Sequence, residues 1–165
     1  MTAAAPPVLL PPALLALMDK GISCIVGSCG LDMRPSIMRA VGSSITAGGA
    51  GVTVYISRSQ SRQLLQDIAS TGRIAVVFSE PATCVTVQLK SGNARIRSAQ
   101  ASDEAALARY LHAMEPQIQQ VGFGPVYARA MLAHRLEDLV AISFEPSQAF
   151  DQTPGPKAGA VLGAP

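Results

Sequence analysis

The stretch Val52-Thr-Val-Tyr-Ile-Ser57, followed by Arg58-Ser-Gln-Ser-Arg62, decides how this chain is interpreted. Its first half is rich in Val, Tyr and Ile, which favour β-strands. Its second half places hydroxyls and arginines before an apolar pattern of helical spacing, with Ser59 or Ser61 as the helix N-cap. A helix N-terminus offers unpaired N–H groups and a positive partial charge, and arginine offers forked donors. The stretch therefore predicts a strand–helix junction that binds a phosphate group.

Short strand-like segments, separated by turn residues, run through most of the chain. Each segment either alternates between apolar and polar residues or is apolar throughout. The predicted strands are residues 22–27, 36–41, 52–57, 73–79, 84–89, 94–97 and 139–144. The first two form a hairpin, and residues 91–93 are expected to be a bulge within one long strand. The glycine-rich residues 46–51 are expected to form a flexible turn.

Four segments have helical patterns and lie between or beside these strands. They are residues 13–19, a helix from Ser59 or Ser61 to Thr71, residues 102–114 and residues 118–134. Glu115-Pro116 is expected to end the third helix, because proline is disfavoured in a helix interior. There are too few strand–helix–strand units for a parallel sheet. The pattern therefore predicts a mainly β, α+β protein: an antiparallel six-stranded split barrel with flanking helices.

Composition narrows the class of protein. Of the 165 residues, 48% are hydrophobic and 15% charged, which predicts one globular domain with a substantial core. An apolar-rich chain with so few charges also favours an oligomer interface, because large exposed apolar patches are rare on monomers. The net charge is +2, and there are only four Phe and three Tyr, so nucleic-acid binding is not expected.

The two ends differ from the middle of the chain. Residues 1–10 are interpreted as a flexible arm, residues 11–145 as the domain, and residues 146–165 as an extended Pro/Gly-rich tail. No basic region precedes the N-terminal apolar residues, which Pro11-Pro12 interrupt. No run reaches the about 18 apolar residues of a membrane span. A soluble, cytoplasmic protein is therefore expected.

The sulfur and imidazole side chains do not form a recognisable metal site. Cys24, Cys29 and Cys84 are odd in number and have strand-like surroundings, which indicates small buried side chains in a reducing compartment. His112 and His134 lie in separate helical segments without neighbouring ligands. No metal is therefore expected. Tyr127 and His134 are candidate lining residues of a substrate pocket, but the favoured interpretation for both is a position in the helical core or on the helix surface.

The ordered set of segments resembles the FMN-binding split barrels related to pyridoxamine 5'-phosphate oxidase. The resemblance covers about residues 22–89 in strand–hairpin–strand–helix–strand–strand order. The residues that carry it are Arg34-Pro35, Arg39-Ala-Val41, Val54-Tyr-Ile-Ser57, Ser61-Arg62, Ile74-Ala-Val-Val-Phe-Ser79 and Val87-Gln-Leu-Lys90, together with the tail Phe150-Asp-Gln-Thr-Pro-Gly-Pro-Lys-Ala-Gly159.

The resemblance implies FMN held at a homodimer interface. Arg39 and the Ser61-Arg62 pair correspond to residues on the cofactor phosphate, and Ser57 to a small hydroxyl at the strand end. Gln88 corresponds to the glutamine facing the flavin ring, and Lys90 to a basic residue beside it. The implied FMN-binding residues are Arg39, Ala40, Val41, Ser57, Ser61, Arg62, Gln88 and Lys90.

The chain also departs from the family's oxidases. Gln63 stands where they usually have a lysine, and Gly42-Ser43-Ser44 where they have a second basic residue. Pyridoxamine 5'-phosphate oxidase activity itself is therefore not expected. Two functions remain: a flavin-dependent oxidoreductase acting on a small organic substrate or cofactor, and a non-catalytic protein of the same fold that binds flavin, haem or F420. A scaffold that has lost its cofactor is a weaker third interpretation.

Overall fold

The computed structural model describes residue 8 and residues 10–163. Its helices are α1 (Pro12–Met18), α2 (Arg62–Thr71), α3 (Glu104–Gln120) and α4 (Pro125–Met131), with short 3₁₀ turns η1 (Ala47–Gly49), η2 (Ala101–Asp103) and η3 (Leu136–Asp138). Its strands are β1 (Ser23–Cys29), β2 (Pro35–Arg39), β3 (Gly42–Ile45), β4 (Val52–Ser57), β5 (Ile74–Ser79), β6 (Thr86–Ser91), β7 (Arg95–Ser98), β8 (Leu139–Phe144), β9 (Gln148–Asp151) and β10 (Val161–Leu162).

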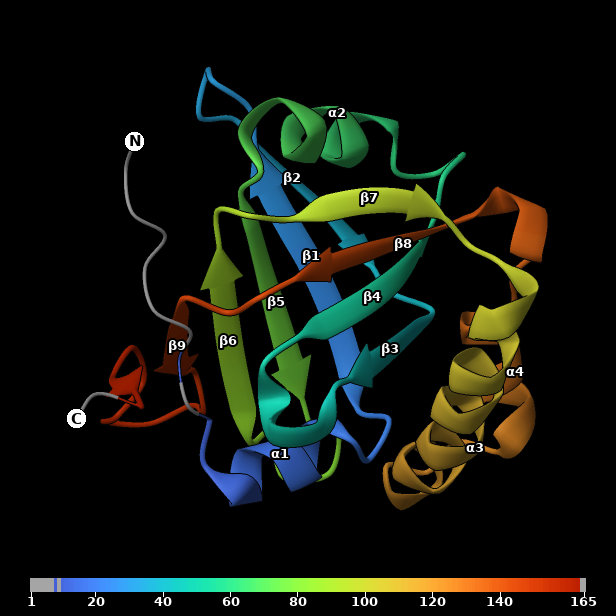
Figure 1. Cartoon of the computed structure of the whole chain (residues 1–165). Coiled ribbons are helices and arrows are strands. Elements are labelled where there is room, and N and C mark those ends of the chain that lie inside the picture. Colours follow the sequence, from blue (N-terminus) through green and yellow to red (C-terminus); the bar gives the residue numbers. More distant parts are fainter. Residues whose placement is uncertain (1–7, 9, 164–165) are drawn as a thin grey trace.

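The strands form two antiparallel sheets that pack face to face. The larger sheet has the order β10-β9-β6-β5-β1-β2, and the smaller has the order β3-β4-β8-β7. Figure 1 shows the smaller sheet lying across the larger one, with α2 at one end and α3 and α4 along one side. Apolar residues that alternate along the strands fill the space between the sheets, among them Val26, Phe78, Val54 and Ile142, each 0% exposed. The predicted antiparallel α+β architecture is confirmed.

The strand count differs from the six expected, because the described residues contain ten strands in two sheets. The chain changes sheet after Ser91: β6 pairs with β5 and β9, whereas β7 pairs with β8 in the other sheet. The prediction of one long strand with a bulge at residues 91–93 is therefore wrong. Alternation continues on both sides of the crossing, so the sequence pattern does not reveal the change of partner.

Helix α3 continues through Pro116, so the expected break at Glu115-Pro116 is also wrong. Proline removes one hydrogen bond of the helix, but one face of the turns on both sides of it is buried. Met114 is 0% exposed and Ile118 is 6% exposed, and both belong to the main hydrophobic core. Packing of these side chains stabilises the second half of the helix beyond what local propensity favours.

The C-terminal segment adds strands to the larger sheet. β9 pairs with β6, and β10 pairs with β9. Most of the predicted N-terminal arm lies outside the described residues. Of its described residues, Val8 donates a backbone hydrogen bond to the Pro146 carbonyl, and Leu10 is 3% exposed. In the described part of the chain, every helix is too short or too polar to cross a membrane.

The three cysteines differ in environment, so the expectation that all are buried is only partly correct. Cys24 is 0% exposed, and burial raises the pKa of its thiol, so it stays protonated. Cys29 is half-buried, while Cys84 is exposed in the turn before β6. Over residues 8 and 10–163, no three His, Cys, Asp or Glu side chains gather as a metal site.

Alternation along the larger sheet produces an outward face with ordered cross-strand rows. One row contains Arg39 of β2, Ile25 of β1, Val77 of β5 and Gln88 of β6, in that spatial order. Phe150 of β9 continues it beyond Gln88. Arg39 and Gln88, which are far apart in sequence, thus share one face and one row, separated by three strand spacings or about 14 Å.

Candidate cofactor site

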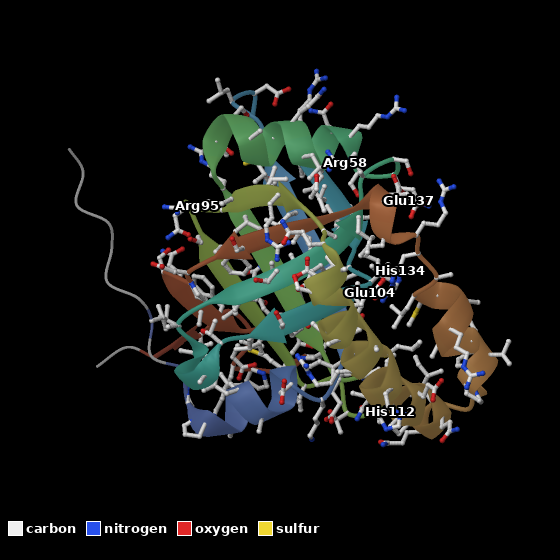
Figure 2. All side chains as sticks on the ribbon, turned by 45° about the vertical axis from the view of Figure 1, so that its right-hand side comes forward. Arg58, Arg95, Glu104, His112, His134 and Glu137 are labelled. Carbon is white, nitrogen blue, oxygen red and sulfur yellow. The ribbon has the colours of Figure 1, made fainter. Side chains whose placement is uncertain are left out.

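A cleft of about 640 Å³ opens beside the edge strand β2, at the Arg39 end of this row. One wall is formed by the ends of β2 and β4, and the other by α4 and the connection that follows it. The lining residues are Met38, Arg39, Val41, Ser57, Ser59, Gln60, Ala130, Met131, Ala133, His134, Arg135 and Asp138. Figure 2 shows His134 and Glu137 on the connection between α4 and β8, on the side of the molecule that carries Arg58.

Arg39 is exposed at the end of β2 and is positioned by the neighbouring strand. Its Nη1 donates a hydrogen bond to Ser23 Oγ at 2.9 Å, and Ser23 lies on the same outward face. Within the described residues it forms no ion pair, so its charge is available to an anionic ligand. Ala40, by contrast, is 0% exposed, and its N–H donates to the Cys24 carbonyl.

Asp138 binds the polar residues at the end of β4. Its carboxylate accepts hydrogen bonds from Ser57 Oγ at 2.6 Å, Ser59 Oγ at 2.7 Å and the Ser59 N–H at 3.0 Å. The Arg58 N–H donates to its backbone carbonyl at 2.7 Å. The hydroxyl of Ser57 is the first cause of a lowered pKa for Asp138, followed by that of Ser59, so this group is a carboxylate at neutral pH.

The N-terminus of α2 keeps unused hydrogen-bond donors. Ser61 occupies the N-cap position but its side chain caps no backbone N–H. Its Oγ is buried, with the residue 3% exposed, and has no hydrogen-bond partner in the described structure. Arg62 is exposed at the first helical position. A hydroxyl without a partner beside helix N–H groups suits a phosphate oxygen, but Ser61 Oγ is buried below the surface, and neither Ser61 nor Arg62 lines the cleft.

Gln88 lies at the other end of the row and has a fixed orientation. Its Oε1 accepts a hydrogen bond from Gln152 Nε2 at 3.2 Å, which leaves its own amide N–H groups for another acceptor. Lys90 lies one row away, with its Nζ 4.9 Å from the centre of the Phe150 ring. Lys90 also lines a second cleft, of about 750 Å³, whose floor includes Gly27 and Ala75.

The expected residues are therefore divided between two ends of one surface. Arg39, Val41 and Ser57 line the first cleft, which reaches Gln60, directly before Ser61-Arg62. Gln88 and Lys90 lie three strand spacings away on the same outward face. Of the two candidate pocket residues, His134 lines the first cleft, with its Nδ1 2.8 Å from the Leu132 carbonyl, whereas Tyr127 is not among the lining residues.

Sequence reasoning missed Ser59, Gln152 and Asp138 as contributors to the site. Asp138 precedes β8 and is 81 residues from Ser57, and Gln152 is 64 residues from Gln88. Tertiary contacts of this separation leave no local pattern in a single sequence. Ser59 had a signal, because the notable stretch Arg58-Ser-Gln-Ser-Arg62 contains it, although it was considered only as a helix cap.

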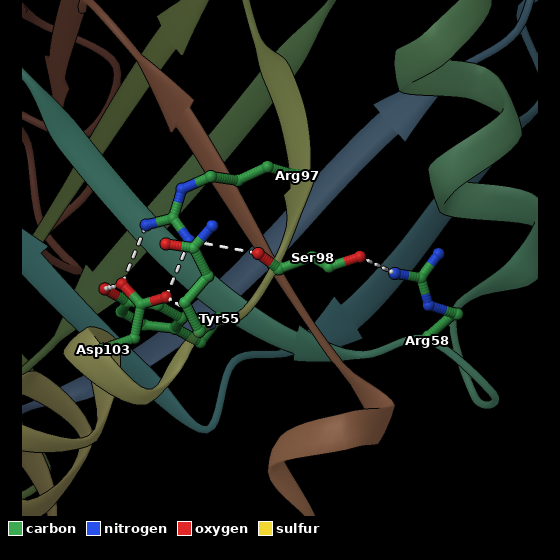
Figure 3. A network of polar contacts seen from close by, with 6 residues as sticks. Tyr55, Arg58, Arg97, Ser98 and Asp103 are labelled. Carbon is green, nitrogen blue, oxygen red and sulfur yellow. Dashed lines mark hydrogen bonds and ion pairs between the residues drawn. The ribbon is translucent and has the colours of Figure 1, made fainter.

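A second carboxylate, Asp103, forms a separate polar network on the smaller sheet (Figure 3). It accepts two hydrogen bonds from the Arg97 guanidinium, at 2.6 and 2.8 Å, and one from the Tyr55 hydroxyl at 3.0 Å. The Arg97 guanidinium is the first cause that holds the pKa of Asp103 well below its usual range. Close by, Arg58 donates to Ser98 Oγ at 2.8 Å.

No protein-family model matches the chain, and no curated protein sequence is significantly similar to it. Solved structures, however, share its fold. HupZ of Group A Streptococcus is 14% identical with a TM-score of 0.56, over 91% of this chain and 99% of HupZ. A candidate pyridoxamine 5'-phosphate oxidase of Lactobacillus delbrueckii is 9% identical with a TM-score of 0.54, over 86% of this chain and 93% of that one. An F420 reductase is 13% identical with a TM-score of 0.52, over 85% and 98% of the two chains.

These similarities identify the fold as that of the pyridoxamine 5'-phosphate oxidase-like proteins. The resemblance seen in the sequence is confirmed at the level of the fold. At identities of 9–14%, the function of this chain must be argued from its own site residues.

Proposed function

We propose that this protein binds FMN across the outward face of the larger sheet and acts as a flavin-dependent oxidoreductase on a small organic substrate or cofactor. The observation that carries the proposal is the row from Arg39 to Gln88. It has a cation at one end, an oriented amide at the other, and Ile25 and Val77 between them. FMN has the matching parts: a charged phosphate joined to a flat ring with a polar edge.

The phosphate end of the ligand would lie in the cleft beside β2. Arg39 and Arg62 would supply charge, and Ser61 Oγ and the uncapped N–H groups of α2 would supply hydrogen bonds. These donors match a phosphate monoester in chemical type, and binding would require the ligand to reach Ser61 Oγ, which lies below the surface. Val41 lines the same cleft, whereas Ala40 would contribute only by fixing the backbone around it.

The ring end would lie on the apolar floor between Ile25 and Val77, with Gln88 donating to its polar edge. Lys90 would place positive charge beside the ring and favour a reduced, anionic flavin. Bound FMN supplies the hydride or electron transfer, so the protein needs chiefly to orient it and to admit a substrate.

A second copy of the chain is proposed to cover this face and complete the site. The outward residues of the larger sheet are only partly buried, and Ile37 on β2 is 72% exposed. A two-fold arrangement would present the same face of both copies to each other and would create two equivalent sites. Light scattering coupled to gel filtration tests this arrangement, because a monomer would leave the face uncovered.

The proposal is tested by the absorption spectrum of protein incubated with FMN and passed through a desalting column. We expect flavin bands to remain with the wild type and to be lost in the double variant Arg39→Ala/Arg62→Ala. Arg58→Ala is the matched control, because it removes a nearby arginine whose side chain is bound to Ser98. Wild-type protein that elutes colourless would overturn FMN binding.

The second candidate is a protein that binds flavin, haem or F420 without catalysis. It is favoured by the position of Asp138. Its carboxylate accepts hydrogen bonds from the Ser57 and Ser59 hydroxyls, which makes the cleft less suited to a phosphate monoester and more suited to a ligand without one. Addition of NADH or NADPH to FMN-loaded protein separates the two functions. Bleaching faster than that of free FMN supports the oxidoreductase, and unchanged yellow colour supports binding alone.

A further inference from the structure

Asp138 takes up the hydrogen-bond donors that the end of β4 offers to the cleft. Ser57 Oγ, Ser59 Oγ and the Ser59 N–H all point to its carboxylate, at 2.6–3.0 Å. A hydroxyl has one proton to donate, so each serine bound to Asp138 can offer only lone pairs to a ligand. A phosphate has only acceptor oxygens at neutral pH and gains nothing from such lone pairs.

The charge of Asp138 has no close partner within the described residues. Arg135 is the nearest basic residue along the chain, but its Nε lies 3.7 Å from the carboxylate of Glu137. The charge of Arg135 is the smallest of the causes that lower the pKa of Asp138. Asp103 differs, because the Arg97 guanidinium lies against it. A phosphate entering the cleft would therefore meet, besides Arg39 and Arg135, a carboxylate without an ion-pair partner, at the place where serine hydroxyls are expected to help bind it.

We propose that Asp138 is a specificity-determining residue of the cleft, which competes with a ligand's phosphate for the donors of Ser57 and Ser59. The proposal rests on the proposed function, since it concerns how strongly the same site prefers FMN to riboflavin, the flavin without phosphate. Arg39, Arg62 and Ser61 remain to bind phosphate, so FMN still enters, but its advantage over riboflavin is small. The position of a single carboxylate thus sets how far the site distinguishes phosphorylated from unphosphorylated flavin.

The experiment measures the dissociation constants of FMN and riboflavin by flavin fluorescence, for wild type and Asp138→Asn. Asparagine keeps the size of the side chain and removes its charge. We expect the preference for FMN over riboflavin to rise about tenfold in the variant, the size of effect typical for one charged hydrogen bond. Glu137→Gln is the matched control, because it removes a charge from the adjacent exposed residue. That variant is expected to change the preference by less than about twofold.

A second variant keeps the proposal testable if Asp138→Asn does not fold. Ser57→Ala in the wild-type background should leave FMN affinity within about twofold, because the lost donor was already bound to Asp138. In the Asp138→Asn background the same change should weaken FMN several-fold, since Ser57 is then free to donate. A large loss in the wild-type background would overturn the proposal, because Ser57 would then bind the phosphate directly.

The results also separate this inference from the proposed function. Wild type that binds FMN, with the same preference in Asp138→Asn, overturns the role of Asp138 and leaves FMN binding in place. Binding of FMN only after Asp138→Asn supports the role of Asp138 and overturns FMN as the ligand of the wild-type protein. Failure of both proteins to bind either flavin overturns the inference together with the proposed function.

Discussion

Two aspartates connect distant segments of this protein, and their surroundings differ in one respect. Asp103 joins β4, β7 and the start of α3, with its side chain 7% exposed and the Arg97 guanidinium against it. Asp138 joins the end of β4 to the start of β8, at the wall of the cleft, where it accepts hydrogen bonds from two hydroxyls and one N–H. The first carboxylate has a cation as partner, and the second has only dipoles.

The difference separates a carboxylate that stabilises the fold from one that occupies hydrogen-bond donors at the cleft. Removal of one partner from a buried ion pair leaves an uncompensated charge in a region of low dielectric, so such pairs persist. Hydroxyl and amide donors at a solvent-accessible cleft can bond to water when their carboxylate partner is removed, so the loss of Asp138 costs little stability. Asp103 is therefore expected to control stability, and Asp138 to control ligand preference.

The largest effect is expected for Asp103→Ala. The substitution leaves the Tyr55 hydroxyl without its acceptor and Arg97 without its partner. Because Arg97 is 47% exposed and can be hydrated, the free energy of unfolding should fall by about 2–3 kcal/mol, below the range for fully buried pairs. Urea denaturation of the variant measures it. Asp138→Ala is the comparison, and a midpoint shift as large as that of Asp103→Ala would contradict the distinction between the two residues.

The second-largest effect is expected in the pH dependence of stability, through Asp103. Its pKa is lower in the folded protein than in the unfolded chain, where an aspartate titrates near about 3.9. The ionised form therefore stabilises the fold above that pH, and the contribution is lost as the pH falls through the folded-state value. In thermal unfolding, the difference in Tm between wild type and Asp103→Asn should be largest at neutral pH and should decrease below about pH 4. If this difference in Tm stayed constant until the protein unfolds in acid, the stabilisation would come from the packing of Asp103 and not from its charge.

The parts of the fold that could be predicted are those that depend on residues close together in the sequence. The apolar run in residues 73–79 and the turn between residues 27 and 36 predict a strand and a hairpin, and the structure confirms both. The strand is fully buried on one face only, because its residues alternate between buried and half-buried. Strand β3 was missed because Gly42-Ser-Ser-Ile45 has low strand propensity and depends on pairing with β4. Helix α3 crosses Pro116 because burial outweighs a lost hydrogen bond.

The arrangement of the candidate site was predictable where its residues are neighbours in sequence or in strand register. Ser61-Arg62 begins α2 as expected, and Arg39 and Gln88 share the outward row that their alternation allows. Asp138 could not have been found in this way, because it reaches the cleft only through the return of the chain after α4. An acidic residue before a strand has many possible partners, and only the folded chain shows which hydroxyls it contacts.

Two neighbouring side chains of β4 extend the comparison to single hydroxyls. Tyr55 is 3% exposed and donates to Asp103, whereas Ser57 is half-buried and donates to Asp138. Tyr55→Phe should lower the free energy of unfolding by about 1.5 kcal/mol, the value of a buried hydrogen bond to a charged group, and leave FMN affinity unchanged. Ser57→Ala should have the smaller effect on the urea midpoint. If Tyr55→Phe and Ser57→Ala lowered the urea midpoint equally, the different surroundings of Asp103 and Asp138 would not determine how much each hydrogen bond stabilises the protein.

The smallest effect is expected where the two regions meet, at Arg58. Its N–H donates to the Asp138 carbonyl and its guanidinium donates to Ser98, next to Arg97 in sequence (Figure 3). The Arg58 and Ser98 side chains are both exposed, so water can replace their hydrogen bond. Arg58→Ala should therefore change the free energy of unfolding by less than about 0.5 kcal/mol, and it leaves the N–H to Asp138 intact. A preference for FMN over riboflavin that changed in this variant would mean that the Arg58 charge reaches the cleft, and that Asp138 is less isolated from cations than its contacts indicate.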